Sequence, residues 1–208
     1  MKLLAIETTA PVATVALWRD GEVTRYSADD TKKHAETVLP LVERLLAETG
    51  ETLSAMDYFA VDIGPGSFTG VRIGVCIANA FGYAVQKPVI GCNALETLRE
   101  ALYGVSEPVC TMIDARNGNA YAALYEGENV LLEPKAVAVA EYLDRLPGIV
   151  RFAGDVPGLA QSDPASARYP DAGALARLAA RRTERAQERA LPLYLRASQA
   201  ERLHKREA

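Results

Sequence analysis

Short apolar runs bounded by turn residues open the chain. Residues 3–7 and 12–19 form two such runs and predict two strands. The dipeptide Asp20-Gly21 favours a tight hairpin turn, and residues 22–27 then alternate polar and apolar side chains, as expected of a third strand. The opening therefore predicts a three-stranded antiparallel meander.

A helical pattern follows this meander. Apolar side chains recur at intervals of three and four residues over 38–49, and Gly50 is a natural helix stop. Pro40 lies inside the pattern, so the helix either begins near Pro40 or is kinked there. The rest of the first half predicts a strand over 58–63, a helix capped by Ser67 that runs to Tyr83, a strand over 88–92 and a helix capped by Asn93 that runs to Leu102.

The second half repeats this order of elements. It predicts strands over 109–114, 120–126 and 130–135, a helix over 140–146, a strand over 149–153, a surface loop over 161–170, a helix over 172–187 and a short strand over 191–195. A shift of 107 positions aligns Glu7 with Asp114, each at the end of a first strand. The same shift pairs Ile6 with Ile113, Ala13 with Ala120, Ala16 with Ala123 and Leu17 with Leu124.

This repetition indicates an α/β protein with the duplicated actin-like (ribonuclease H-like) fold, in which two lobes each hold a mixed sheet flanked by helices. We expect an N-terminal lobe over residues 1–102 and a smaller C-terminal lobe over residues 103–190. Residues 191–208 form a separate C-terminal segment that could return to the N-terminal lobe.

Composition narrows the functional classes. With 49% hydrophobic residues, a net charge of −4 and a pI of about 5.3, the chain is not a nucleic-acid binder by bulk charge, so a role with RNA would need a local basic patch or a partner. The opening residues are too few and too early charged for a signal peptide, and the apolar stretch 71–85 is too short to span a membrane. We therefore expect a cytoplasmic protein without membrane contact. We expect its three cysteines to be buried free thiols: Cys76, Cys92 and Cys110.

The most informative stretch is GPGSFTGVRIG, residues 64–74. A strand, a glycine turn and a helix start favour an anion site there. Its glycine spacing is one residue too wide for a dinucleotide fingerprint, and no Gly-Lys-Ser/Thr follows as in a P-loop. Ser67 lacks the flanking glycines of a hydrolase nucleophile elbow, because Pro65 and Thr69 occupy those places.

Small residues recur every four positions through the same helix: Gly66, Gly70, Gly74, Ala78 and Gly82. Glycine inside a helix costs about 1 kcal/mol relative to alanine, which suggests that close packing compensates. Two alternatives have equal weight, namely packing on the chain's own sheet or packing against a helix of a partner. The helix is apolar nearly all round, which is typical of a helix buried on two sides.

Candidate catalytic groups are few. His34 lacks a second histidine four residues on and so does not match a zinc-binding helix, and we expect His34 and His204 to be solvated surface side chains. Glu7 and Asp114 end equivalent strands, where actin-like enzymes hold magnesium and phosphate, but neither is followed by the glycine that lets phosphate approach. The nucleotide chemistry therefore looks degraded.

We interpret most arginines of the second half as members of ion pairs or of a solvated surface. We expect Arg116 to form an ion pair with Asp114 beside it. The arginines over 181–189 alternate with Glu184 and Glu188 at helical salt-bridge spacing rather than forming a nucleic-acid patch. The charged run 196–205 is expected to be a solvated face.

Five segments in order resemble the TsaB (YeaZ) family. They are the opening MKLLAIETTAPVATVALWRDG, residues 34–46, the GPGSFTGVRIG turn, the run Ile113-Asp114-Ala115-Arg116, and Pro192-Leu193-Tyr194-Leu195-Arg196. The resemblance covers nearly the whole chain, although the second half is short for the family. It implies a duplicated actin-like fold related to the catalytic TsaD subunit, without that subunit's metal-binding histidine motif.

The resemblance also implies a function. Such proteins pair through the first two helices of the N-terminal half, here about 33–49 and 67–83, as homodimers or with TsaD, and the complex includes a small ATPase, TsaE. The complex transfers threonylcarbamoyl from its adenylate to transfer RNA. We expect a non-catalytic scaffold subunit that touches tRNA only within the complex, with no metal and no tightly bound cofactor, and with ATP or ADP and magnesium at most at a complex interface.

Two sets of residues follow as candidates. The expected partner interface comprises His34, Val38, Val42, Leu45, Ser67, Gly70, Val71, Gly74, Ala78 and Gly82. A vestigial nucleotide or anion site comprises Glu7, Thr8, Thr9, Gly64, Gly66, Ser67 and Asp114. No catalytic residue is expected. The alternatives are an actin-like ATPase or kinase with a degenerate nucleotide site and, less favoured, a metalloprotease of the M22 type.

Overall fold

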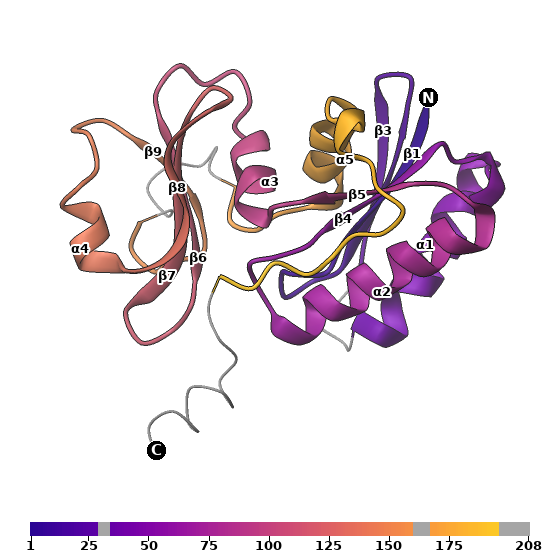
Figure 1. Cartoon of the computed structure of the whole chain (residues 1–208), viewed down its shortest axis with the longest axis horizontal. Coiled ribbons are helices and arrows are strands. Elements are labelled where there is room, and N and C mark those ends of the chain that lie inside the picture. Colours follow the sequence, from indigo (N-terminus) through magenta and orange to yellow (C-terminus); the bar gives the residue numbers. More distant parts are fainter. Residues whose placement is uncertain (29–33, 160–166, 196–208) are drawn as a thin grey trace, which may run out of the picture.

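Two mixed sheets organise the chain into two lobes that lie side by side (Figure 1). The computed structural model describes residues 1–28, 34–159 and 167–195. The first sheet has the strand order β3-β2-β1-β4-β5. Its strands are β1 (Lys2–Glu7), β2 (Thr14–Arg19), β3 (Glu22–Ser27), β4 (Tyr58–Asp62) and β5 (Val89–Cys92).

Burial explains why β1 reads as a continuous apolar run. It lies in the middle of the sheet, antiparallel to β2 and parallel to β4. Helices cover both of its faces, so Leu3 to Ile6 are all fully buried. The hairpin before β3 turns at Asp20 and Gly21, whose φ angles of 50° and 100° suit the predicted Asp-Gly turn.

Two helices pack side by side on one face of this sheet, α1 (His34–Thr49) and α2 (Phe68–Val85) (Figure 1). Pro40 lies inside α1, so the alternative in which the helix begins near Pro40 is wrong. Ser67 caps α2 as predicted, because its hydroxyl accepts a hydrogen bond from the Gly70 amide at 3.2 Å. A short 3₁₀ turn over Leu53–Ala55 connects α1 to β4.

The second sheet repeats the first with one strand fewer. Its order is β8-β7-β6-β9, which matches β3-β2-β1-β4 and confirms the duplicated actin-like fold. Its strands are β6 (Val109–Asp114), β7 (Asn119–Glu126), β8 (Asn129–Ala138) and β9 (Arg151–Gly154). The short α4 (Val139–Leu143) covers its outer side through the buried Tyr142.

The last helix corrects the expected lobe boundary. We assigned residues 103–190 to the C-terminal lobe, but α5 (Ala172–Ala180) packs on β1, β2 and β3 of the first sheet. Its apolar residues share a core with Leu3, Ala16 and Ile90. The helix ends at Ala180 rather than 187, and a 3₁₀ turn over Thr183–Arg185 follows. The N-terminal lobe is therefore completed from the end of the chain.

Beyond this turn, residues 186–195 run back along the N-terminal lobe as an extended segment (Figure 1). Backbone hydrogen bonds join Val89 to Gln187 and the Leu193 amide to the Ile63 carbonyl at 2.8 Å. Asn79 of α2 exchanges two side-chain hydrogen bonds with the backbone of Ala190. No strand forms over 191–195, contrary to the prediction, because the segment bonds to loops and to α2 rather than to a sheet edge. The run 196–208, with His204, lies outside the described residues.

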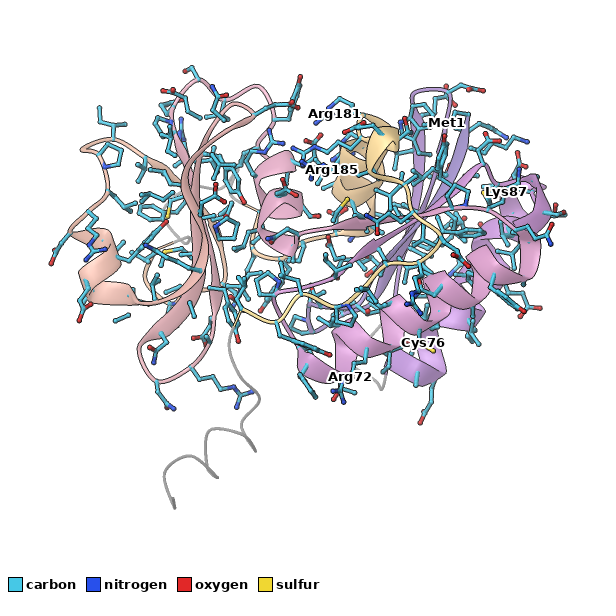
Figure 2. The ribbon with its side chains drawn as sticks, in the orientation of Figure 1. Met1, Arg72, Cys76, Lys87, Arg181 and Arg185 are labelled. Atoms are coloured by element: carbon cyan, nitrogen blue, oxygen red, sulfur yellow. The ribbon has the colours of Figure 1, made fainter. Side chains whose placement is uncertain are left out.

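An ion-pair cluster joins the lobes through α3 (Ala94–Glu100), which packs on both α5 and the second sheet. Two guanidinium nitrogens of Arg181 donate hydrogen bonds to the buried carboxylate of Glu100. The same guanidinium lies 3.8 Å from the carboxylate of Glu128 in the β7–β8 turn. Arg182 and Arg185 both pair with Glu96 of α3. The predicted pairing of these arginines with Glu184 and Glu188 along one helix is therefore wrong. Figure 2 shows Arg181 and Arg185 in the gap between α5 and α3.

Two expectations about α2 and the cysteines also change. Cys92 and Cys110 are buried free thiols as predicted, but Cys76 is exposed on the outer side of α2. The helix extends to 18 residues with a mean hydropathy of 1.3, which by length and composition would suffice to cross a membrane. Its inner side, however, packs on β4 and the core of the first lobe.

Candidate functional site

The small-residue ridge of α2 faces the chain's own sheet. A Cβ added to Gly70 or to Gly74 would overlap atoms of Thr8, at the end of β1. A Cβ on Gly82 would come within 2.7 Å of the Lys87 carbonyl oxygen and 2.8 Å of Val89. The glycines therefore let α2 approach the sheet, and the internal-packing alternative is the one that the structure supports.

This orientation corrects most of the expected partner interface. Only Ser67 of that set is exposed, and His34 is half-buried. The other members are buried within the chain, so they cannot reach a partner while the lobe is folded: Val38, Val42, Leu45, Gly70, Val71, Gly74, Ala78 and Gly82. The residues that the sequence pattern assigned to a partner therefore lie on the inner faces of α1 and α2.

The opposite, outer face of the two helices carries exposed apolar side chains. Leu39 of α1 is 49% exposed, Phe68 at the start of α2 is 42% exposed, and Tyr83 near its end is 85% exposed. Ile73 is half-buried on the same helix, and Cys76 and Arg72 point outward from it (Figure 2). We call this the outer face of α1 and α2.

Two buried carboxyl groups lie behind α2, at the ends of the adjacent parallel strands β1 and β4. Glu7 Oε1 accepts hydrogen bonds from the amide and hydroxyl of Thr9, both at 2.5 Å, and from the Ala10 amide at 3.2 Å. Asp62 Oδ1 accepts a bond of 2.6 Å from the Thr97 hydroxyl. Within the described chain, the second oxygens of both carboxyl groups are buried without a hydrogen-bond partner.

Burial determines the protonation of this pair. It raises the pKa of Glu7 from its ordinary 4.5 to about 7, although the hydrogen bonds from Thr9 and Ala10 lower it. Burial and then the charge of Glu7 raise the pKa of Asp62 well above its ordinary value. For both groups the larger cause is burial, which disfavours the charged carboxylate.

Most residues of the expected nucleotide or anion site pack closely against one another. Glu7 and Thr8 are fully buried, and Thr9 is 5% exposed. Gly66 packs so closely that an added Cβ would lie 2.7 Å from Thr9 Cβ, while Gly64 packs against the Leu193 carbonyl. The residues of the vestigial site are brought together, but only Ser67 and Asp114 stay exposed.

A cleft of about 760 Å³ remains between the lobes, in front of this closely packed turn. Both lobes line it, the first with Thr9, Pro65 and Phe68 and the second with Ile113 to Arg116 and Asp155. The end of the chain closes one side with Leu193, Tyr194 and Leu195. Asp155 Oδ1 accepts a hydrogen bond of 2.7 Å from the Asp114 amide, and burial raises the pKa of Asp155.

Arg116 reaches this cleft from an unusual turn. Arg116 and Asn117 have φ angles of 65° and 55°, which side-chain-bearing residues rarely adopt. Asp114 Oδ1 stabilises the turn by accepting a hydrogen bond of 2.8 Å from the Arg116 amide. The expected ion pair between their side chains does not form. No hydrogen bond or ion pair holds the Arg116 guanidinium to any residue that the structure describes.

His34 differs from a solvated surface histidine. Its Nε2 lies 2.9 Å from the Ala10 carbonyl oxygen, which only accepts, so Nε2 carries a proton and donates the hydrogen bond. Its Nδ1 is buried and has no partner within the described ranges. The ring fixes the start of α1 against the β1–β2 turn at the edge of the cleft.

Sequence analysis missed a cluster at the mouth of the cleft. The Arg72 guanidinium lies 3.9 Å from the ring centre of Phe68, and Arg72 Nε donates a hydrogen bond of 3.0 Å to the Tyr194 hydroxyl. The rings of Phe68 and Tyr194 are 5.1 Å apart. The signal was present, because two of the segments that carry the family resemblance, residues 64–74 and the run that begins at Pro192, supply these side chains.

Metal ligands are not gathered in this region. Across residues 1–28, 34–159 and 167–195, no three His, Cys, Asp or Glu side chains are arranged to hold a metal ion.

Comparisons with known proteins agree with this architecture. The family model for TsaD, a tRNA N6-adenosine threonylcarbamoyltransferase, matches residues 28–166. The tRNA threonylcarbamoyladenosine biosynthesis protein TsaB of Escherichia coli is 34% identical over 158 residues, which cover 71% of this chain and 68% of that protein. TsaB of Bacillus subtilis is 32% identical over 151 residues, with 70% and 66% covered. TsaB of Haemophilus influenzae is 34% identical over 132 residues, with 62% and 56% covered.

Two solved structures superpose closely on this chain. A Pseudomonas aeruginosa protein described as similar to peptidase YEAZ superposes with a TM-score of 0.81 and 30% identity, over 94% of this chain and 99% of that one. YeaZ from Pseudomonas aeruginosa superposes with a TM-score of 0.78 and 30% identity, over 93% and 99%. These superpositions span nearly all of both chains, whereas the matched region is about half to two thirds of the length of the curated relatives.

Proposed function

Because this chain belongs to the TsaB (YeaZ) family, we propose that it acts in tRNA threonylcarbamoyladenosine biosynthesis as a non-catalytic subunit. In this role it binds and activates a TsaD-like catalytic subunit, together with a TsaE-like ATPase. It also pairs with itself when that subunit is absent. Contact with tRNA occurs within the complex, in the cytoplasm.

The exposed outer face of α1 and α2 is the observation that carries this proposal. Leu39, Phe68 and Tyr83 present large apolar groups to solvent over two adjacent helices. A relative with the same pair of helices could lay them against this face and form a helical bundle. A bilayer is a poorer occupant, because Thr8 and the glycines fix the inner side of α2 to the sheet and the helix cannot leave it.

The closely packed turn supports a role without chemistry of its own. One carboxylate oxygen of Glu7 accepts three hydrogen bonds from Thr9 and Ala10, and the other is buried. Glu7 therefore cannot ligate magnesium from the cleft. Thr8 is fully buried and packs against Gly70 and Gly74 of α2. These contacts weigh against the actin-like ATPase or kinase. A nucleotide, if the complex uses one, would then sit at an interface between subunits.

The direct test is association of the purified chain with the TsaD-like subunit of its own cell. Leu39→Asp and Tyr83→Asp place a charge on the outer face at exposed positions where folding tolerates it. We expect each to weaken association by at least tenfold in sedimentation, because an unpaired charge would be buried. Ile149→Asp, at a 76% exposed position in the other lobe, is the matched control and should bind normally.

Deletion of the gene should also abolish the modified adenosine in tRNA, measured by mass spectrometry of nucleosides. Unchanged modification in the deletion strain would refute the proposed role. Equal association of Tyr83→Asp and Ile149→Asp would instead move the interface elsewhere on the chain.

A further inference from the structure

We propose that the mouth of the interlobe cleft is a binding surface for single-stranded RNA, on which a base stacks against the exposed ring of Tyr194 while a neighbouring phosphate pairs with Arg116. This inference rests on the proposed function, since a role in tRNA modification supplies the RNA. It goes further because it assigns a contact with RNA to this subunit and to particular side chains.

The aromatic part of the surface is already in place. Phe68 is 42% exposed and Tyr194 is 45% exposed, with their rings 5.1 Å apart. Arg72 fixes both, through its position 3.9 Å from the Phe68 ring and its hydrogen bond to the Tyr194 hydroxyl. Aromatic rings and guanidinium planes are the groups on which proteins stack unpaired RNA bases.

The cationic part lies on the opposite wall. The Arg116 guanidinium, unpaired among the described residues, lines the cleft from a turn whose two positive φ angles hold it there. A conformation of this kind is stabilised by its surroundings and is often found where a side chain must point at a ligand. Arg168 lines the same wall and lies 5.3 Å from the ring centre of Tyr169.

The acidic residues of the cleft do not cancel this charge. Asp114 and Asp155 each use an oxygen to accept a backbone hydrogen bond within the turn region, from the amides of Arg116 and Asp114 respectively. With Arg72 at the rim, three guanidinium groups surround the opening against these two carboxyl groups. The local balance is thus cationic although the whole chain carries −4, which is the local patch that an RNA role requires.

A mononucleotide bound as in an actin-like kinase would need a different site, with room for its phosphates behind the cleft. The closely packed turn at Thr8 and Thr9 leaves no room for phosphates there. The surface described here lies at its mouth, is open to solvent and can accept a continuous strand rather than an enclosed nucleotide.

The test measures fluorescence anisotropy of a labelled, unstructured seven-nucleotide RNA that contains adenosine, with the full chain at low salt. Tyr194→Leu should weaken binding at least fivefold, through loss of a stacked base. Arg116→Gln should weaken binding and lower the slope of log K against log salt by about 0.7, the share of one phosphate contact. Arg189→Gln, exposed beside the far end of α2, has the same change of charge and should bind as the parent does.

Several outcomes would overturn the inference. These are no RNA binding by the parent chain, equal affinities of Arg116→Gln and Arg189→Gln, and tight binding of AMP that RNA does not displace. The same variants should still associate with the TsaD-like subunit in sedimentation. Normal association without RNA binding would reject this inference and leave the proposed function standing, whereas failure of the parent chain to associate would reject the proposed function.

Discussion

The hydroxyl of Thr8 donates a hydrogen bond of 2.7 Å to the Gly70 carbonyl oxygen. The bond joins the end of β1 to the first turn of α2 and is fully buried. It forms because Gly70 and Gly74 have no side chain, so the helix can lie against the backbone of Thr8. This close approach thus explains why glycine stands at both positions of the helix.

Gly70→Ala should destabilise the fold. The new methyl group would overlap the Thr8 carbonyl, and because backbone atoms cannot yield cheaply, the loss should be roughly 2–3 kcal/mol or more in urea denaturation. Gly148→Ala is the control, because nothing lies within 4 Å of its added Cβ, and it should change stability by less than about 0.5 kcal/mol. Gly74→Leu would likewise report on folding rather than on pairing. A stable Gly70→Ala protein would show that the helix does not lie this close.

Protonation of Glu7 should make stability fall as pH rises. Its pKa is about 7 in the folded chain and near 4.5 when unfolded, so the stabilisation is complete below about pH 4.5 and is lost as pH rises through about 7. The shift corresponds to a loss on the order of 2–3 kcal/mol between pH 5 and pH 8.5. Urea denaturation at the two pH values measures it.

Glu7→Gln should remove most of this slope and raise stability at pH 8.5, since the amide keeps an oxygen for Thr9 and carries no charge. Glu126→Gln, at an exposed position on β7, should leave the slope unchanged. A slope equally steep in Glu7→Gln would assign the titration to another group, with Asp62 the first to examine.

Much of the fold follows from sequence patterns because those patterns are local. The Asp20-Gly21 turn, the Ser67 cap and the repeated acid at Glu7 and Asp114 each depend on neighbouring residues, and the structure has them where the sequence puts them. The repeated strand order also follows, since the same short pattern occurs twice.

The wrong predictions concern which side of a helix faces the sheet and which residues far apart in the sequence are in contact. A helix that is apolar all round, such as α2, gives no periodic signal for its inner side, so the glycine ridge and the outer face were exchanged. The partners of Arg181 and Arg72 lie 81 and 122 positions away, at Glu100 and Tyr194. The spacing of residues within one segment cannot predict contacts over such distances. For the same reason it could not place α5 on the first sheet.

Arg181→Ala should loosen the junction between the lobes. Glu100 is 2% exposed, and without Arg181 its carboxylate loses two charged hydrogen-bond donors, which should cost about 2–4 kcal/mol. Hydrogen exchange should rise in α3 and in the β7–β8 turn, where Glu128 also loses its partner. Arg44→Ala breaks an exposed pair with Glu48 and should cost less than about 1 kcal/mol. Equal losses in the two variants would mean that the Arg181 cluster does not hold the lobes together.

Cys76 should report on the proposed interface without any mutation. It is exposed on the outer side of α2, whereas Cys92 and Cys110 are buried and burial raises the pKa of both thiols, that of Cys110 to about 12. A thiol reagent at pH 8 should therefore modify one cysteine per folded chain and three in denaturant, because the thiolate is the reactive form. Binding of the TsaD-like subunit to the outer face should slow modification of Cys76 at least tenfold. The Tyr83→Asp variant, which should not associate, supplies the control, and an undiminished rate in a saturated complex of the parent chain would place the partner on a different surface.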